Sequence, residues 1–168
     1  MRTKGLYSRC RDVVRRLDIP HPFTAEELCR RIAAVRNRPL DLLPLPTPTV
    51  PGTPSGMWLM TETRDYIFYD SQTSLPHQEH IILHEIGHML CGHEKGQLDA
   101  HLYRNFDATD PNMFHRAFAR IRYTNRQEQE AELVATIILA AAGRLPAPTP
   151  FTGVLASMES ALGFQRKQ

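Results

Sequence analysis

Apolar side chains recur at helical spacing near the start of the chain. Two helices are expected there, over residues 3–17 and 24–37. In the second, Leu28, Ile32 and Val35 recur on one face and predict the stripe that this helix buries. Both stretches also carry many arginines, which a solvated helix face accommodates.

The same spacing predicts three further helices and a short amphipathic segment, at 76–91, 111–123, 126–142 and 154–162. Proline opens the first two of these helices, where its missing N–H removes no helical hydrogen bond. Glycine follows the first and the third, as is typical of helix ends. The second half of the chain is therefore expected to be mostly helical.

Two short runs rich in aromatic and β-favouring residues, 57–60 and 66–69, flank a polar turn and predict an antiparallel hairpin. Six prolines between positions 39 and 54 exclude a persistent helix or a central strand there. We therefore expect an α+β fold, mostly helical with a small antiparallel sheet.

Three parts are expected along the chain. Residues 1–38 form basic N-terminal helices packed on the core, residues 39–54 a proline-rich connector, and residues 55–168 the main domain. With 168 residues, 42% hydrophobic and 23% charged, the chain has the material for one ordinary core. No apolar run is long enough to span a bilayer. We also expect no secretory signal.

Cysteine content and charge indicate the cellular location and the kinds of partner to expect. The three cysteines, Cys10, Cys29 and Cys91, are odd in number and scattered, which favours a reducing, cytoplasmic location. Residues 1–38 carry ten Lys or Arg against four Asp or Glu, although the net charge of the whole chain is only +2. Because no nucleic-acid-binding motif accompanies these charges, we expect a solvated face that touches no nucleic acid directly.

The most informative segment is a His-Glu-x-x-His pattern formed by His84, Glu85 and His88 on an expected helix. Residues four apart lie one turn apart on the same face, so both imidazoles can bind one ion. The intervening glutamate can take a proton from a water molecule on that ion. Because eight histidines allow a chance match, a third ligand is the test.

Zinc in a hydrolase takes three protein ligands and leaves one position open. The candidates for the third ligand are the downstream histidines and one acidic cluster: His93, His101, His115, Glu128, Glu130 and Glu132. His93 follows the pattern too closely and is expected to line the rim of the site. Glu130 is expected to point to the opposite side, into solvent.

Glu128 and Glu132 are the stronger candidates, because they lie four apart on one face of an apolar helix. Glu128 is predicted to bind the metal. Glu132, one turn further, is predicted to accept the other ring N–H of a ligating histidine, His84, and so fix its tautomer. The alternative is that all three glutamates of the cluster lie at a solvated helix start, where they interact favourably with the helix dipole.

Other polar residues near the pattern are weaker candidates. His77, His80 and Cys91 fall on the same helix face and are expected to line the site. A group that stabilises the developing oxyanion is also expected. The spacing does not choose among four residues for this role: His101, Tyr103, His115 and Tyr123.

Segments 80–93 and 128–135 together resemble the ImmA/IrrE family of metallopeptidases, in which a glutamate-led helix follows the His-Glu-x-x-His helix. The similarity covers roughly residues 55–145. It implies a gluzincin-like metallopeptidase core and a helix-turn-helix repressor as substrate. Since this chain shows no DNA-binding motif, the regulator would be a separate chain. The long stretch 95–124 departs from the family and is expected to be an insertion that gates the cleft.

The resemblance also implies His84, His88 and Glu128 as ligands of one Zn²⁺, with Glu85 as the general base. The sequence thus predicts a zinc-dependent metallo-endopeptidase that acts in transcription regulation by cleaving a protein partner. The alternative is a zinc-stabilised regulatory binding protein that sequesters or senses a transcription factor without cutting it. Glu85 favours the enzyme, because a purely structural zinc site does not require it.

Overall fold

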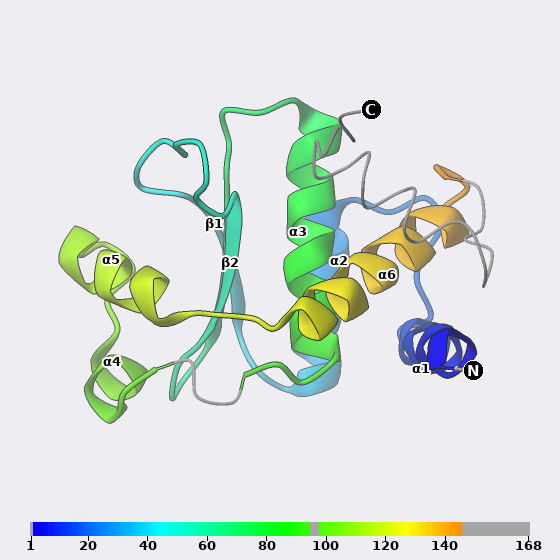
Figure 1. Ribbon diagram of the computed structural model, residues 1–168, viewed down its shortest axis with the longest axis horizontal. Helices are drawn as coiled ribbons and strands as arrows, with labels where there is room; N and C mark the ends of the chain where they lie inside the picture. The colour runs from blue at the N-terminus through cyan, green and yellow to red at the C-terminus, as the bar shows by residue number, and fades with distance from the viewer. Residues whose placement is uncertain (1, 95–97, 146–168) are drawn as a thin grey trace.

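The computed structural model describes residues 2–94 and 98–145, and within these ranges the chain forms six helices and three strands (Figure 1). They are α1 (Arg2–Arg15), α2 (Ala25–Arg36), β1 (Leu40–Pro44), β2 (Gly56–Met60), β3 (Asp65–Tyr69), α3 (Leu75–Leu90), α4 (Ala100–Asn105), α5 (Pro111–Arg120) and α6 (Asn125–Ala141). The expected mixture of many helices with a small sheet is confirmed. The expected segment 154–162 lies outside the described residues. A helix that crosses a bilayer would have to be longer and more apolar than any within the described ranges.

The sheet has the strand order β1-β3-β2 and is mixed. The expected hairpin is present, with β2 antiparallel to β3. The expectation of a purely antiparallel sheet is wrong, because β1 pairs with β3 in parallel. This strand lies at the start of the proline-rich stretch, at an edge of the sheet. Its only proline, Pro44, ends the strand, where a missing N–H interrupts little of the ladder.

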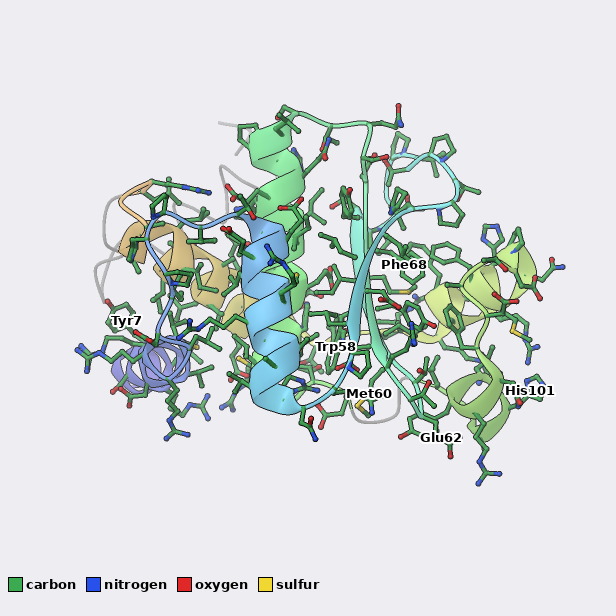
Figure 2. The ribbon with its side chains drawn as sticks, turned by 180° about the vertical axis from the view of Figure 1, so that it is seen from behind. Tyr7, Trp58, Met60, Glu62, Phe68 and His101 are labelled. Carbon is green, nitrogen blue, oxygen red and sulfur yellow. The ribbon has the colours of Figure 1, made fainter. Side chains whose placement is uncertain are left out.

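The two faces of the sheet bury different clusters, because successive strand residues point to opposite sides. Trp58 and Ile67 belong to the main core, together with residues of α1, α2, α3 and α6. Met57 and Phe68 face the other way and pack with Phe114 of α5. In Figure 2, Trp58 lies between the sheet and the central helices, and Phe68 lies on the side of α5. Helices α4 and α5 therefore cover the far face of the sheet.

Helix α2 begins at a capping box, in which Thr24 and Glu27 exchange side-chain and backbone hydrogen bonds. Leu28 and Ile32 are buried as expected, but Val35 is 67% exposed. The buried stripe runs instead through Ala25, Leu28, Cys29 and Ile32. Val35 lies about 70° from the centre of that stripe at 100° per residue, which places it at the margin.

Helices α3 and α6 pack closely, because small residues face each other where they meet. A methyl group on Gly87 would lie 2.5 Å from the carbonyl oxygen of Ala131. Ala131 and Ala135 are both fully buried. Small residues on both helices thus permit this close approach. In Figure 1, α6 runs across α3 and α1 lies beyond it, so three segments distant in sequence meet around one region.

Candidate metal centre

Helices α3 and α6 bring His84, His88 and Glu128 together, as the sequence predicts. His84 Nε2 lies 3.1 Å from His88 Nε2 and 3.0 Å from Glu128 Oε2. His88 Nε2 lies 3.6 Å from the same carboxylate oxygen. The potential ligand atoms of the three residues all lie within 4.8 Å of one another. Two residues one helical turn apart and one residue from a second helix therefore face a common point.

The donor set fits a divalent cation of the zinc type. Two imidazole nitrogens and one carboxylate oxygen are ligands that Zn²⁺ takes in hydrolases, with one position left for water. Two ring nitrogens that face each other at 3.1 Å can share only one proton between them. A cation at their meeting point would satisfy both lone pairs and the carboxylate together.

The surroundings set the protonation of these ligands. Burial lowers the pKa of His88 to about 4, so this ring is neutral at pH 7 and can offer a lone pair. Burial alone would lower the pKa of His84 too, but its hydrogen bonds to Glu128 and Glu132 outweigh burial and raise its pKa to about 10. Burial would raise the pKa of Glu128, yet its bonds from the two histidines lower it to about 2. A proton on His84 and a cation are thus alternative partners for the glutamate.

Glu132 lies where the sequence predicts it, beside the first histidine. Its Oε2 atom is 3.3 Å from His84 Nδ1 and 3.1 Å from His80 Nε2. An ionised carboxylate accepts only, so it favours the His84 tautomer with the proton on Nδ1 and the lone pair on Nε2. His80, expected to line the site, shares this carboxylate.

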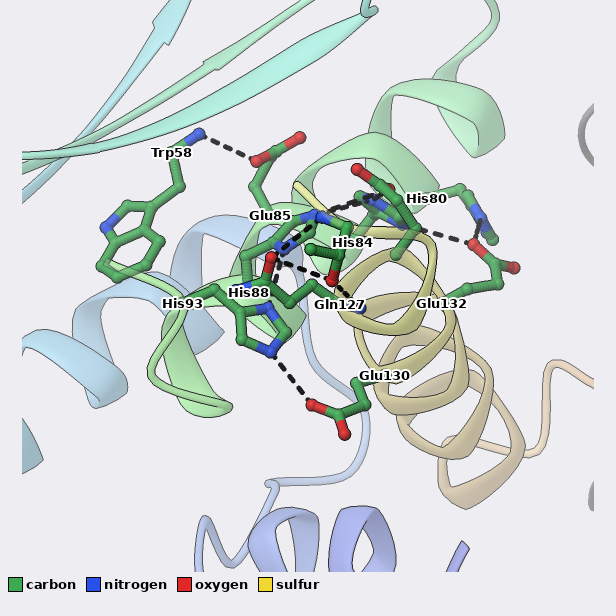
Figure 3. A network of polar contacts seen from close by, with 11 residues as sticks. Trp58, His80, His84, Glu85, His88, His93, Gln127, Glu130 and Glu132 are labelled. Carbon is green, nitrogen blue, oxygen red and sulfur yellow. Dashed lines mark hydrogen bonds and ion pairs between the residues drawn. The ribbon is translucent and has the colours of Figure 1, made fainter. Parts of the chain in front are cut away.

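Glu85 lies between the two histidines along α3, and its side chain points towards strand β2 (Figure 3). It is 5% exposed, and its Oε2 atom accepts a hydrogen bond from the backbone N–H of Trp58 at 2.8 Å. Burial raises the pKa of Glu85 to about 7, although His84 and the Trp58 N–H act to lower it. Strand and helix approach closely here, since a methyl group on Gly56 would lie 2.9 Å from Glu85 Oε1. A carboxyl group with this pKa can both take and return a proton at neutral pH.

These residues open into a cleft of about 390 Å³. Its wall is formed by the start of β2 and the loop before it, by α3, by the end of α5 with the loop that follows, and by α6, and it includes the five predicted site residues. The lining residues are Pro54, Ser55, Gly56, Met57, His77, His80, Ile81, His84, Glu85, His88, Phe118, Ile121, Arg122, Tyr123, Glu128 and Glu132. The end of the segment 95–124 thus borders the cleft.

Of the four residues considered for oxyanion stabilisation, Tyr123 borders the cleft. Its ring stacks on His88 with the centroids 3.6 Å apart and an angle of 13° between the planes. His101 and His115 are exposed on α4 and α5. Tyr103 lies on α4, where its carbonyl accepts a hydrogen bond from the N–H of Glu62. Tyr123 is thus the one of the four that the described part of the chain places at the cleft.

The contacts of two residues near the site, His93 and Glu130, were not predicted from the sequence. His93 is 6% exposed and lies behind His88, with the two Nδ1 atoms 2.9 Å apart. Its Nε2 atom is 3.0 Å from Glu130 Oε2. The expectation that Glu130 points into solvent is wrong, because α1 packs over this part of α6 and Arg9 binds the carboxylate. No local spacing could have shown this, since it depends on how α1 docks.

Comparisons with known proteins assign no family to the chain. No protein-family model matches it, and no significant match was found among curated proteins or solved structures. The resemblance to ImmA/IrrE peptidases and to a gluzincin-like core therefore stays a prediction. What the chain can do follows from the arrangement of its own side chains.

Proposed function

We propose that this chain is a zinc-dependent endopeptidase of the ImmA/IrrE type with a gluzincin-like core. One observation carries the proposal: the ligand atoms of His84, His88 and Glu128 converge in a cleft that also holds the buried carboxyl group of Glu85. A purely structural zinc site needs four protein ligands and no adjacent base. Three ligands with an acid–base group beside them suit hydrolysis.

Zinc held by these three residues would polarise a water molecule and the carbonyl of the scissile peptide bond. Glu85 takes a proton from the attacking water on its carboxylate as the new carbon–oxygen bond forms. The same carboxyl group then returns this proton to the amide nitrogen as the carbon–nitrogen bond breaks. Burial raises the pKa of Glu85 in the metal-free protein, which favours a carboxyl group able to hold the transferred proton.

Strand β2 offers a way to align a protein substrate. It is an edge strand, and its residues Gly56 and Met57 border the cleft beside Glu85. An extended peptide that pairs with such an edge lies with its backbone along the strand and its amide bonds next to the site. The proposed substrate is a separate protein, a helix-turn-helix repressor, whose cleavage would relieve repression.

The decisive experiment compares the wild-type protein with Glu85→Gln. Both are loaded with zinc and incubated with a candidate helix-turn-helix repressor from the same organism, and intact partner is followed by mass spectrometry. The wild type is expected to cut the partner and to stop when a chelator removes zinc. Glu85→Gln should keep one zinc per chain but cut at least about 100-fold more slowly, because it cannot accept the proton.

Two other results would speak against hydrolysis. Equal cleavage by Glu85→Gln would remove Glu85 as the base. A partner that binds the zinc-loaded wild type but stays intact would favour the regulatory binding protein, in which zinc holds α3 and α6 together.

A further inference from the structure

The residues behind His88 form a chain of hydrogen bonds that the proposed mechanism does not use. After α3 ends, Gly92 adopts a φ of +70°, and His93 follows it immediately, beside His88. From His88 the contacts continue through His93 to Glu130 on α6 (Figure 3). His88 and His93 are 1% and 6% exposed, so these contacts are shielded from water. We propose that His93 and Glu130 are positioning residues that fix the tautomer and ring orientation of His88 for metal binding.

The direction of each hydrogen bond follows from the carboxylate at the end. Arg9 and Arg126 lie 2.7 and 3.1 Å from Glu130 Oε1, so this group is ionised and its Oε2 atom only accepts. His93 therefore donates from Nε2. In neutral His93 the other ring nitrogen, Nδ1, then accepts, and the Nδ1–H of His88 is the donor that faces it.

This order leaves the Nε2 atom of His88 with a lone pair, pointing at His84 and Glu128. The reverse order, with both ring nitrogens of His93 protonated, would put the proton of a neutral His88 on Nε2 and block its bond to a cation. His93 thus plays for His88 the part that Glu132 plays for His84. Each of the two histidine ligands is thus backed by a carboxylate. Glu132 contacts His84 directly, whereas Glu130 acts on His88 through the imidazole of His93.

A second ion site is the alternative reading of these contacts, since Cys91, His93 and Glu130 also offer ligand atoms within 4.8 Å of one another. The charges argue against it. The two guanidinium groups on Glu130 would lie beside such a cation and repel it. A carboxylate already compensated by two arginines suits a hydrogen-bond acceptor better than a metal ligand.

The inference rests on the proposed metal-dependent function, and zinc affinity tests it without any substrate. Zinc binding is measured by competition with a chromogenic chelator for the wild type, His93→Leu, His93→Gln and Glu130→Gln, with the exposed His115→Leu as the control. His93→Leu should weaken zinc about 10- to 100-fold. His93→Gln should recover most of the loss, because its amide can accept from His88 and donate to Glu130. The visible spectrum of the cobalt-substituted protein should change in His93→Leu and match the wild type in His115→Leu.

The outcomes separate the two proposals. Near-ultraviolet circular dichroism before metal addition shows whether each variant is folded, and if His93→Leu is not, the comparison of His93→Gln with Glu130→Gln decides. Zinc affinity within twofold of the wild type in folded His93→Leu, or in Glu130→Gln where His93→Leu does not fold, would overturn the positioning role, as would two ions per wild-type chain that fall to one in His93→Leu. A wild type that binds zinc but cuts nothing would overturn the peptidase alone. A wild type that binds no zinc would overturn both.

Discussion

His84 is the residue on which the charges of the site converge. Its two ring nitrogens face Glu128 and Glu132, which come from successive turns of α6. When the protein is prepared free of metal, a proton on His84 supplies the positive charge that these carboxylates need. Zinc entering the site must displace that proton, so zinc binding is expected to release protons and to strengthen as pH rises.

The first prediction concerns the pH dependence of the zinc-free protein. Folding lowers the pKa of Glu128 and Glu132 from 4.5 to about 2, so their contribution is present above pH 4.5 and is lost as pH falls through about 2. It raises the pKa of His84 from 6.5 to about 10, so that contribution is present below pH 6.5 and is lost as pH rises through about 10. Urea unfolding of chelator-treated protein should therefore give midpoints that fall at both extremes.

Two other shifts act between these limits and oppose each other. The raised pKa of Glu85 lowers stability as pH rises from 4.5 to about 7, whereas the lowered pKa of His88 raises it between about 4 and 6.5. In Glu132→Gln the acid limb should be shallower. An unchanged acid limb in this variant would show that the Glu132 contacts do not contribute to stability.

Spacing within two helices was enough to select the five residues that the structure gathers at the cleft. The His-Glu-x-x-His pattern and the four-residue step from Glu128 to Glu132 are local features, so helical geometry alone predicts which side chains share a face. Their catalytic and ligand roles stay predictions. The contact between His93 and Glu130 was not predicted, because it depends on a turn at Gly92 and on the docking of a distant helix. Neither follows from the spacing of residues within one helix.

At the scale of elements, the separation of α3 and α6 decides whether the two halves of the site meet. Both histidines lie on α3 and both of their glutamate partners lie on α6. The helices touch backbone to backbone at Gly87 and Ala131, in the turn between His84 and His88. Any side chain larger than hydrogen at position 87 must push α6 outwards, since the opposing atoms belong to the backbone.

The second prediction is therefore that Gly87→Ala destabilises the protein and weakens its metal site together. The added methyl group should cost about 1–3 kcal/mol of the free energy of unfolding, as overpacking in a core does. Zinc affinity should fall at least tenfold, because Glu128 moves with α6. Gly5→Ala is the matched control, since a methyl group there meets no atom within 4 Å. Zinc affinity that is unchanged in Gly87→Ala would mean that this contact does not set the ligand distance.

Elements defined by local pattern were easier to predict than their pairing. The hairpin of β2 and β3 joins neighbours in sequence, and its aromatic runs and polar turn are visible in the chain. Strand β1 pairs with β3, which is distant in sequence, and β1 carries a proline. No local sequence feature therefore predicts this strand or its pairing. Val35 shows the same limit on a smaller scale, since the neighbouring elements decide which part of an apolar stripe is covered.

Across the whole molecule, the sheet lies between the main core and an aromatic layer, and residues of that layer also border the cleft. The main core holds α2, α3 and α6 on one face, while Phe68, Phe106 and Phe114 pack with α4 and α5 on the other. Helix α1 packs against α6 on the side of Glu130. It contacts the residues behind the centre through Arg9, whose side chain is 60% exposed and binds Glu130.

The third prediction tests this contact with Arg9→Ala. Because the pair is half in solvent, the free energy of unfolding should change by less than about 1 kcal/mol. Zinc affinity should fall measurably but less than in His93→Leu, since Arg126 still holds the same carboxylate. Arg15→Ala, on the exposed last turn of α1, is the control and should bind zinc as the wild type does. A loss in Arg9→Ala equal to that in His93→Leu would show that Arg126 gives no support.

The distance along the chain between His88 and Glu128 has a consequence for the life of the protein in a cell. An ion bound to both residues in the folded chain would link α3 to α6 across the intervening α4–α5 segment, and this link is lost when the chain unfolds. Binding to the folded form alone also shifts the folding equilibrium by mass action. The amount of this protein in the cell would thus follow the zinc supply. Chains made when zinc is scarce would unfold more often and be degraded by cellular proteases.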